Sequence, residues 1–518
     1  MGQFRRFYLK AGRRPLLSAW LFFFAFAVIS ALLLQLVVLP FLFPALHAGN
    51  GLLIGGDWVG FHWFAVELAE KVVREGWEAW ELRPDRQAPA GIAAVVYVFF
   101  GPHPWALVPI NAAVHATTAV LLVRILQPFV PDVRYALLCV LPFVFFPSSL
   151  TWYSQIHKDG AFFLGIFLCL YGWLLLSRPE TWTRRYAQAL IPLLCLFVGC
   201  CLIWVMRPYG IKLMQGIGCI FAFMLVPYFV VKALQRKLSF AQTLLASLIV
   251  VLLPLALGIF KDRGEKGEVT LVTEAMLTDT APSLVAIDDG KNVGDGKNVG
   301  EGQNVGEGQN VGKGKKVGKG KKIGGGTVTA EEERRGAFAI KAQNVVAELH
   351  WKKTDWLPDF LDNAFLTLSV VRSGYAGSKG GSNIDADVRF RSAPEFLPYL
   401  PRAVQIGFTA PFPTSWFMQG ASGGATFMRR ISAMEMLFVY ASLFFLPYAL
   451  WRWRGQIETW LTFSFCGILL LLYTYITPNI GSLYRSRHGF LMLLLAFCIA
   501  GAIAARQRMS GAPPHPNT

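Results

Sequence analysis

The sequence predicts an all-α, polytopic membrane protein with about ten transmembrane helices, and three observations predict this class. Of the 518 residues, 54% are hydrophobic and only 16% are charged, against roughly 25% charged residues in soluble domains. Several uncharged stretches are about as long as the ~20 residues that cross a bilayer. The basic residues gather at the ends of these stretches. This pattern excludes a cytosolic globular enzyme and a nucleic-acid-binding protein.

The net charge of +17 is explained by membrane topology, because short loops rich in lysine and arginine mark the cytoplasmic side. If the N-terminus is cytoplasmic, ten alternating spans place every basic cluster on that side and leave both chain ends there. These clusters are Arg5/Arg6/Lys10/Arg13/Arg14, Arg124/Arg134, Arg178/Arg184/Arg185, Lys232/Arg236/Lys237, Arg452/Arg454 and Arg506/Arg508. We therefore expect an integral membrane protein whose N- and C-termini are both cytoplasmic.

The ten apolar spans lie near 16–43, 105–123, 135–150, 160–177, 189–206, 210–231, 238–260, 431–450, 456–476 and 489–505. The first is too long for a cleavable signal and is predicted to be a retained signal-anchor. All eight cysteines fall inside apolar stretches, which favours small core residues over disulfides or a zinc site. The first seven spans form a predicted membrane core over residues 1–260, and the last three belong to 431–518.

The first outer loop, 44–104, contains two further predicted helices. Its amphipathic stripe of Trp58, Phe61, Ala65, Leu68 and Val72 fits a helix on the membrane surface or a helix packed on neighbouring spans. Residues 91–100 are apolar but short for a full crossing, so they predict a half-inserted helix. Counting them as a span would place the following basic clusters outside, against the charge rule.

The second large outer loop, about 261–430, has two parts. Residues 261–335 include six glycine-rich hexads over 290–325. Hexads also build left-handed β-helices, but this composition buries too little apolar surface and favours a disordered linker. Residues 336–430 predict a small extracytoplasmic subdomain with helices near 361–371 and 394–408. Its aromatic residues suit the membrane interface: Trp351, Trp356, Tyr375, Tyr399 and Trp416.

Ionisable residues occur at the outer ends of several spans, where the positive-inside tendency disfavours cations. They are Asp57, His157-Lys158-Asp159, Arg207, and Arg485-Ser486-Arg487-His488. Because arginine binds phosphate bidentately and lysine acts as a point charge, a shared anionic ligand would explain them. Simpler interpretations remain open. Asp57 would then be a helix N-cap, 157–159 a solvated connector, and Arg207 a side chain reaching lipid headgroups.

These residues resemble the GT-C membrane glycosyltransferases, above all uncharacterised members found with bacterial surface-polysaccharide genes. The resemblance rests on the many spans, the long first outer loop with an early aspartate, and short motifs. The motifs are Phe146-Pro147-Ser148, Lys158-Asp159, Arg207-Pro208-Tyr209, Tyr399-Leu400-Pro401-Arg402, Pro411-Phe412-Pro413 and Tyr484-Arg485-Ser486-Arg487. It implies a GT-C-like fold and a sugar donor linked to polyprenyl phosphate, used at the outer face.

The resemblance implies roles for Asp57, Arg485 and Arg487, and the position of the other ionisable residues on the same outer face suggests theirs. Asp57 would be the general base on an acceptor that is a glycan, a lipid or a protein. The donor phosphate would be bound by Lys158, Arg207, Arg485, Arg487 and His488. Acceptor binding or support would fall to His157, Asp159, Arg372 and Arg402. Whether a divalent metal is needed is left open, because the fold would have to bring the carboxylates of Asp57, Asp159 and Asp385 together. Membrane lipids are the expected surroundings.

Two other functions fit the same residues. An O-antigen-type polymerase or ligase also joins polyprenyl-linked glycans outside the membrane. A non-enzymatic flippase or exporter of lipid-linked sugars is the third possibility. Transporters typically show paired repeat halves with a site at mid-membrane, and the sequence shows no such doubling.

Overall fold

The computed structural model describes residues 15–84, 87–183, 187–259, 349–376, 382–420 and 423–509. Within these ranges the chain forms helices and no strand, as predicted; two isolated β-bridges join His47 to Leu53 and Asn383 to Asn479. The N-terminal basic cluster, Arg184, Arg185 and the linker 261–335 lie outside the described residues.

In the part of the chain that is described, eight helices or helix pairs are long and apolar enough to cross a membrane. The chain is therefore an integral membrane protein. The eight are α2 (Pro15–Leu33) with the π-helix η1 (Leu34–Leu42), η5 (Pro104–Leu107) with α5 (Val108–Leu126), α8 (Asp159–Leu176), α10 (Ala187–Met206), α11 (Gly210–Leu234), α19 (Gly423–Leu443) with α20 (Leu446–Arg452), α21 (Ile457–Ile476) and α22 (Ile480–Met509).

Two of the ten predicted spans take other forms, so the count of ten stays a prediction. The 135–150 span is a pair of helices, α6 (Val133–Phe145) and α7 (Pro147–Ser154), bent by 70°. The residue before a proline avoids the helical region, and Phe146 accordingly has an extended ψ of 134°. Counting this pair as one span gives nine. The 238–260 span contains α12 (Phe240–Ala256), a helix of 17 residues.

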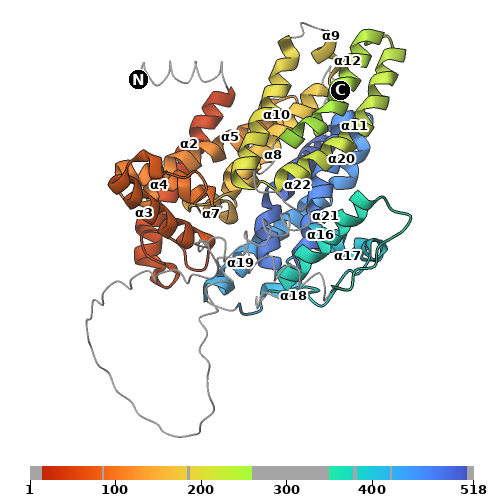
Figure 1. The fold of residues 1–518 in the computed structure, drawn as a ribbon. Coiled ribbons are helices and arrows are strands. Elements are labelled where there is room, and N and C mark those ends of the chain that lie inside the picture. Colours follow the sequence, from red (N-terminus) through yellow and green to blue (C-terminus); the bar gives the residue numbers. More distant parts are fainter. Residues whose placement is uncertain are drawn as a thin grey trace, which may run out of the picture.

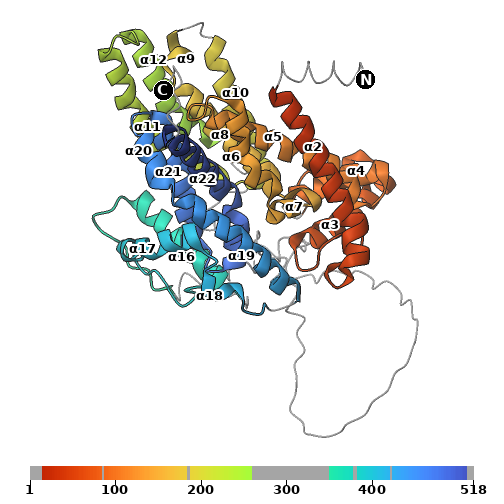
Figure 2. The same ribbon diagram turned by 180° about the vertical axis from the view of Figure 1, so that it is seen from behind.

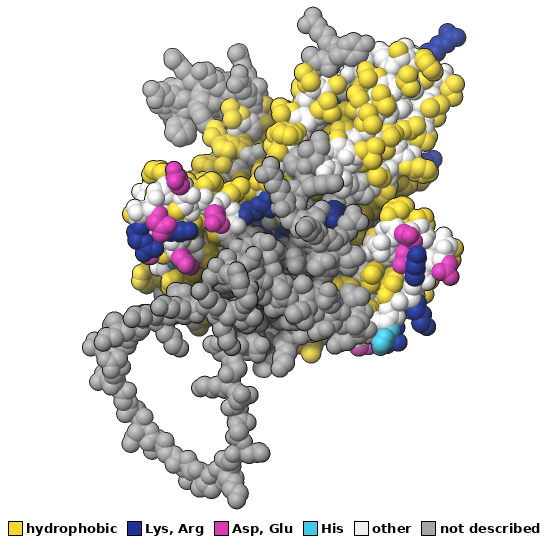
Figure 3. Space-filling view, viewed as in Figure 1, with side chains coloured by type: hydrophobic (Ala, Val, Ile, Leu, Met, Phe, Trp, Pro, Cys, Tyr) yellow, Lys and Arg dark blue, Asp and Glu magenta, His cyan; other side chains and the backbone are white. Residues whose placement is uncertain are grey.

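The long helices α8, α10, α11 and α12 run in roughly the same direction (Figure 1). α2 begins and α22 ends at the end of the molecule where the short helix α9 (Pro179–Thr183) lies (Figures 1 and 2). On one face, hydrophobic side chains cover the half around α8, α10, α11 and α12, whereas charged side chains gather over α3 and α4 and near α17 (Figure 3). A broad apolar surface beside charged ends is what a bilayer-embedded protein presents.

The predicted first outer loop contains a pair of packed helices. α3 (Asp57–Glu75) and α4 (Ala88–Phe100) bury the predicted stripe against each other, with Phe61, Ala65, Leu68 and Val72 on α3. The facing residues of α4 are small alanines and Tyr97, and small residues let helix backbones approach closely. Of the two interpretations left open, the stripe therefore packs on a neighbouring helix.

The predicted subdomain contains α16 (Asp359–Ala376), η7 (Ala393–Glu395), α17 (Phe396–Thr409) and α18 (Pro413–Trp416). The two predicted helices, 361–371 and 394–408, fall on α16 and α17. The subdomain packs against α21 through an aromatic cluster of Phe390, Phe396 and Tyr475. It is therefore attached to the membrane helices through a core of its own.

Arg372 and Arg402 stabilise this subdomain. Arg372 is 1% exposed and donates to backbone carbonyls, among them those of Val388 at 3.1 Å and Tyr475 at 3.0 Å. Arg402 holds the Asp385 carboxylate with two bonds, Nε to Oδ2 at 2.9 Å and Nη2 to Oδ1 at 3.1 Å. Both arginines therefore have intramolecular partners that account for their positions.

The Asp385–Arg402 pair makes the docking of this subdomain sensitive to acid. The hydrogen bond from Arg402 lowers the pKa of Asp385 below its usual value. A lowered folded-state pKa adds stability above the unfolded value of about 3.9, and this stability is lost as the pH falls through the folded-state pKa. We expect the protection of residues 382–409 against hydrogen exchange, relative to the intrinsic exchange rate at each pH, to be unchanged from pH 7 to 5 and lower below about pH 4. Asp385→Asn should show the lower protection already at pH 7; identical profiles for both proteins would contradict this.

Candidate functional site

Asp159 and Arg207 meet because α8 and α10 pack antiparallel. α8 begins at Asp159 and α10 ends at Met206, so the start of one helix lies beside the end of the other. Glycines allow close packing, since a Cβ on Gly165 would lie 2.9 Å from the Gly199 carbonyl oxygen. Arg207 then donates to the Asp159 carboxylate. With side-chain exposures of 1% for the acid and 4% for the base, the pair is buried.

Arg485 reaches this pair from α22. Gly489 of α22 lies directly against Phe163 of α8, where an added Cβ would stand 2.6 Å from Cδ1 of the ring. Gly489 and Phe163 each lie about one helical turn after Arg485 and Asp159. This contact therefore places Arg485 beside Asp159, with Nε 3.4 Å from Oδ2.

Asp57, the first residue of α3, is the second partner of Arg485. Its Oδ2 lies 2.8 Å from Nη2 of Arg485, and the two side chains are 16% and 26% exposed. Asp57 does not act as an N-cap, because Gly56 occupies the cap position and no side chain makes a capping bond. The Trp58 indole fixes the entry to the helix by donating to the Leu53 carbonyl at 2.5 Å. Through Arg485, the partly exposed Asp57–Arg485 ion pair is thus connected to the buried Asp159–Arg207 pair.

His157 and Lys158 are buried beside this network, so the solvated-connector interpretation is wrong. Lys158 Nζ lies 3.1 Å from Gln87 Oε1 and 5.5 Å from the centre of the Phe61 ring. His157 Nδ1 lies 3.0 Å from Asp159 Oδ2 and 3.1 Å from the Asp159 backbone nitrogen. Burial lowers the pKa of His157, so the ring is neutral at pH 7. If the ring proton is on Nδ1, His157 donates a hydrogen bond to the Asp159 carboxylate. If it is on Nε2, Nδ1 accepts a hydrogen bond from the Asp159 backbone N–H.

A second polar group lies on α7 and α22, next to the first. His488 Nε2 is 3.1 Å from the Ser149 hydroxyl. Glu435 of α19 accepts a hydrogen bond from the Ser148 backbone N–H at 2.8 Å and another from the Tyr484 hydroxyl. Our sequence analysis missed Glu435. The signal was a single carboxylate inside the apolar span 431–450, and ionisable residues within spans mark functional sites by default.

Arg487 has other partners than a donor phosphate. It is fully buried and donates to the backbone carbonyls of Ile406, Gly407 and Ala410, which end helix α17. An unpaired helix C-terminus needs such donors. Within the described residues, no hydrogen bond or ion pair joins Arg487, Arg372 or Arg402 to the Asp57–Arg485 pair. We therefore assign these three arginines to holding the subdomain in place.

Arg207 does not reach toward lipid headgroups as one interpretation had it, because it is buried and bound to Asp159 and to the Tyr209 hydroxyl at 2.6 Å. The structure brings Asp57, His157, Asp159, Arg207 and Arg485 into one network. Lys158 is adjacent in the chain to two of its members, and His488 lies three residues after Arg485. No group of three or more His, Cys, Asp or Glu side chains in the described ranges is arranged to hold a metal. Asp385 is bound to Arg402 instead.

This arrangement presents a carboxylate and a guanidinium together at an accessible surface, on a base of buried charges. A carboxylate takes protons from hydroxyls within hydrogen-bond reach, and a guanidinium binds phosphate. Comparisons with protein-family models, with curated proteins and with solved structures find no match. The chemistry of the network is therefore the basis for a functional proposal.

Proposed function

We propose that this protein transfers a sugar from a polyprenyl-phosphate carrier to an acceptor hydroxyl at the extracytoplasmic face of a bacterial inner membrane. Such a reaction belongs to the biosynthesis of surface polysaccharide or another cell-envelope glycan. The observation that supports it best is the accessible Asp57–Arg485 pair, with 2.8 Å between Oδ2 and Nη2. It combines in one place the two groups that the reaction needs.

Arg485 is the proposed ligand of the donor phosphate. The donor's phosphodiester carries one negative charge, as a carboxylate does, and its two unesterified oxygens accept two parallel bonds from a guanidinium. We infer that the donor displaces Asp57 from Arg485 on binding. Because Arg485 keeps its contact with the buried Asp159, the guanidinium stays in place during this exchange.

Asp57 is the proposed general base. Once released from Arg485, its carboxylate accepts the proton of the acceptor hydroxyl. The hydroxyl oxygen forms a bond to the anomeric carbon while the bond from that carbon to the phosphate oxygen breaks. Polyprenyl phosphate leaves with the electron pair, and Arg485 stabilises the negative charge that grows on it.

The buried residues act through Arg485 in this proposal. Arg207 and His157 bind Asp159, and Asp159 in turn orients Arg485. Lys158 and His488 are buried as well, so we assign them to the positive environment and the packing around the site. They were expected to contact the donor, and this remains an expectation. Side chains at helix ends whose neighbours are fixed by hydrogen bonds and packing can hold a substrate in one geometry.

The experiment uses the full chain in nanodiscs with a polyprenyl-phosphate monosaccharide that is radiolabelled in the sugar. We expect release of polyprenyl phosphate together with a labelled product in the presence of a membrane lipid and glycan extract. Consumption of a polyprenyl-diphosphate oligosaccharide alone would favour the polymerase or ligase. Movement of the donor across liposome membranes without cleavage would favour the flippase or exporter. Either result would replace the proposal.

A further inference from the structure

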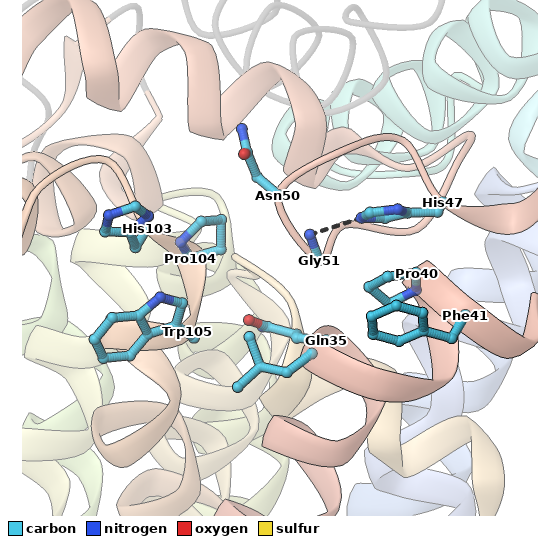
Figure 4. Close-up of a pocket in the computed structure, with 10 residues that line it drawn as sticks. Gln35, Pro40, Phe41, His47, Asn50, Gly51, His103, Pro104 and Trp105 are labelled. Atoms are coloured by element: carbon cyan, nitrogen blue, oxygen red, sulfur yellow. Dashed lines mark hydrogen bonds between the residues drawn. The ribbon is translucent and has the colours of Figure 1, made fainter. Parts of the chain in front are cut away.

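A cavity that is separate from the charged network lies at the end of the first span. It has a volume of about 330 Å³ and lies between η1 and the segment 103–105. Pro40 and Phe41 stand on one side and His103 and Trp105 on the other, with Asn50 and Gly51 above them (Figure 4). Its lining, all within the described residues, includes no lysine, arginine, aspartate or glutamate. We call it the η1 groove.

Gln35 gives the η1 groove an unmet hydrogen-bonding need. The side chain is 2% exposed, and its Nε2 donates to the Ser154 carbonyl. Its Oε1 is buried and has no hydrogen-bond partner among the described residues, and Figure 4 shows this oxygen turned towards the cavity. A buried carbonyl without a donor is unfavourable, so a ligand that supplies a hydroxyl or N–H would satisfy it.

The backbone around Gln35 is shaped to hold this position. η1 is a π-helix of nine residues, and π-turns are rare and recur at functional sites. Gly51 has φ +77°, and a Cβ there would lie 2.7 Å from the Gln35 Cβ, so only glycine lets the loop close over the glutamine. The His47 ring fixes that loop by accepting the Gly51 N–H at 2.9 Å.

The rim of the groove is apolar and outward-facing. Phe41 is 76% exposed and Leu36 is 50% exposed, both on a helix that is long enough to cross the membrane. Trp105 offers an aromatic face at the same rim. Sugar rings combine hydroxyls, which donate to acceptors such as Gln35, with apolar C–H faces that lie on aromatic rings. A charged headgroup would find no opposite charge in this lining.

We infer that the η1 groove binds the neutral sugar headgroup of a glycolipid, whose chains lie along Phe41 and Leu36 in the membrane. The Gln35 carbonyl accepts a sugar hydroxyl, and Trp105 supports the ring. The loop 51–58 connects this groove to Asp57. That the bound glycolipid is the acceptor of sugar transfer rests on the proposed function, whereas the binding itself does not.

The test is photo-labelling of the full chain in nanodiscs by three matched diazirine lipids. One carries a single glucose on diacylglycerol, one is diacylglycerol, and one is phosphatidic acid. We expect the glucosyl probe to label residues 35–51 and 103–105 most strongly. Loss of one hydrogen bond of about 1.5 kcal/mol should lower this labelling roughly tenfold in Gln35→Met. Trp105→Ala, a change at the exposed rim, should lower it as well.

Phe99→Ala is the matched control, because Phe99 is an exposed aromatic of α4 outside the groove. It should label like the unchanged protein. Equal labelling by the three probes, or unchanged labelling in Trp105→Ala and a correctly folded Gln35→Met, would overturn the inference. Sugar transfer without selective labelling would contradict glycolipid binding in the η1 groove but not the proposed function. Selective labelling without sugar transfer would support glycolipid binding and contradict the proposed function.

Discussion

Asp57→Asn is expected to lower sugar transfer by roughly 10²–10⁴-fold, the usual contribution of a general base. Asparagine has nearly the same shape and keeps an oxygen for Arg485, but it takes no proton from a hydroxyl. The side chains of Arg485 and Asp57 are only 26% and 16% exposed, but Arg485 keeps the Asp159 carboxylate and the asparagine oxygen, so no buried charge is left without a partner. The variant should therefore remain folded and abundant. Transfer rates in nanodiscs, with melting temperature measured on the same sample, check both statements.

Glu67→Gln is the matched control for this experiment. Glu67 is a second carboxylate on the same helix, α3, and it is exposed. Its substitution removes the same charge from the same element without touching the network, so transfer should not change. Asp57→Asn with full activity would remove Asp57 from the mechanism. Equal losses in both variants would point to the overall charge of α3 rather than to a base.

Helix positions were predictable from the sequence where an apolar pattern alone decides them. The α3 stripe follows the 3.6-residue period, and its residues are buried as the pattern requires except Trp58, which is partly buried. The bend between α6 and α7 follows from Pro147, but the apolar run across it is continuous and predicts one span. The direction of the bend depends on what α7 packs against, including Glu435, which lies 287 residues away in the chain.

The candidate site was predictable as a set of residues but not as a set of partners. Topology gathers charges at the same ends of spans, and Asp57 and Arg485 do lie together. Residues two apart on a helix are rotated by about 200° about its axis and therefore point to nearly opposite sides. Arg485 and Arg487 therefore face different neighbours: Arg485 meets carboxylates, and Arg487 meets the end of α17. The sequence motif contains both arginines but does not show which one faces the carboxylates of Asp57 and Asp159.

Asp159→Leu is expected to destabilise the folded protein by about 3–5 kcal/mol, because it leaves a buried charge on Arg207 without its partner. Asp159 is 1% exposed and has contacts with Arg207, Arg485 and His157. A large fall in the melting temperature of the protein in nanodiscs measures this loss. Asp359→Asn, which breaks the exposed pair with Lys353, is the control and should leave the melting temperature unchanged.

The double variant Asp159→Leu/Arg207→Met separates stability from function. Replacing both members of a buried pair by apolar residues of similar volume is often neutral or stabilising, so the melting temperature should recover. Transfer should not recover, because Arg485 has lost the carboxylate that orients it and only Asp57 remains to hold it. A double variant with full activity would show that the buried pair serves folding alone. A double variant as unstable as the single one would contradict the assignment of Asp159 and Arg207 as each other's principal partners.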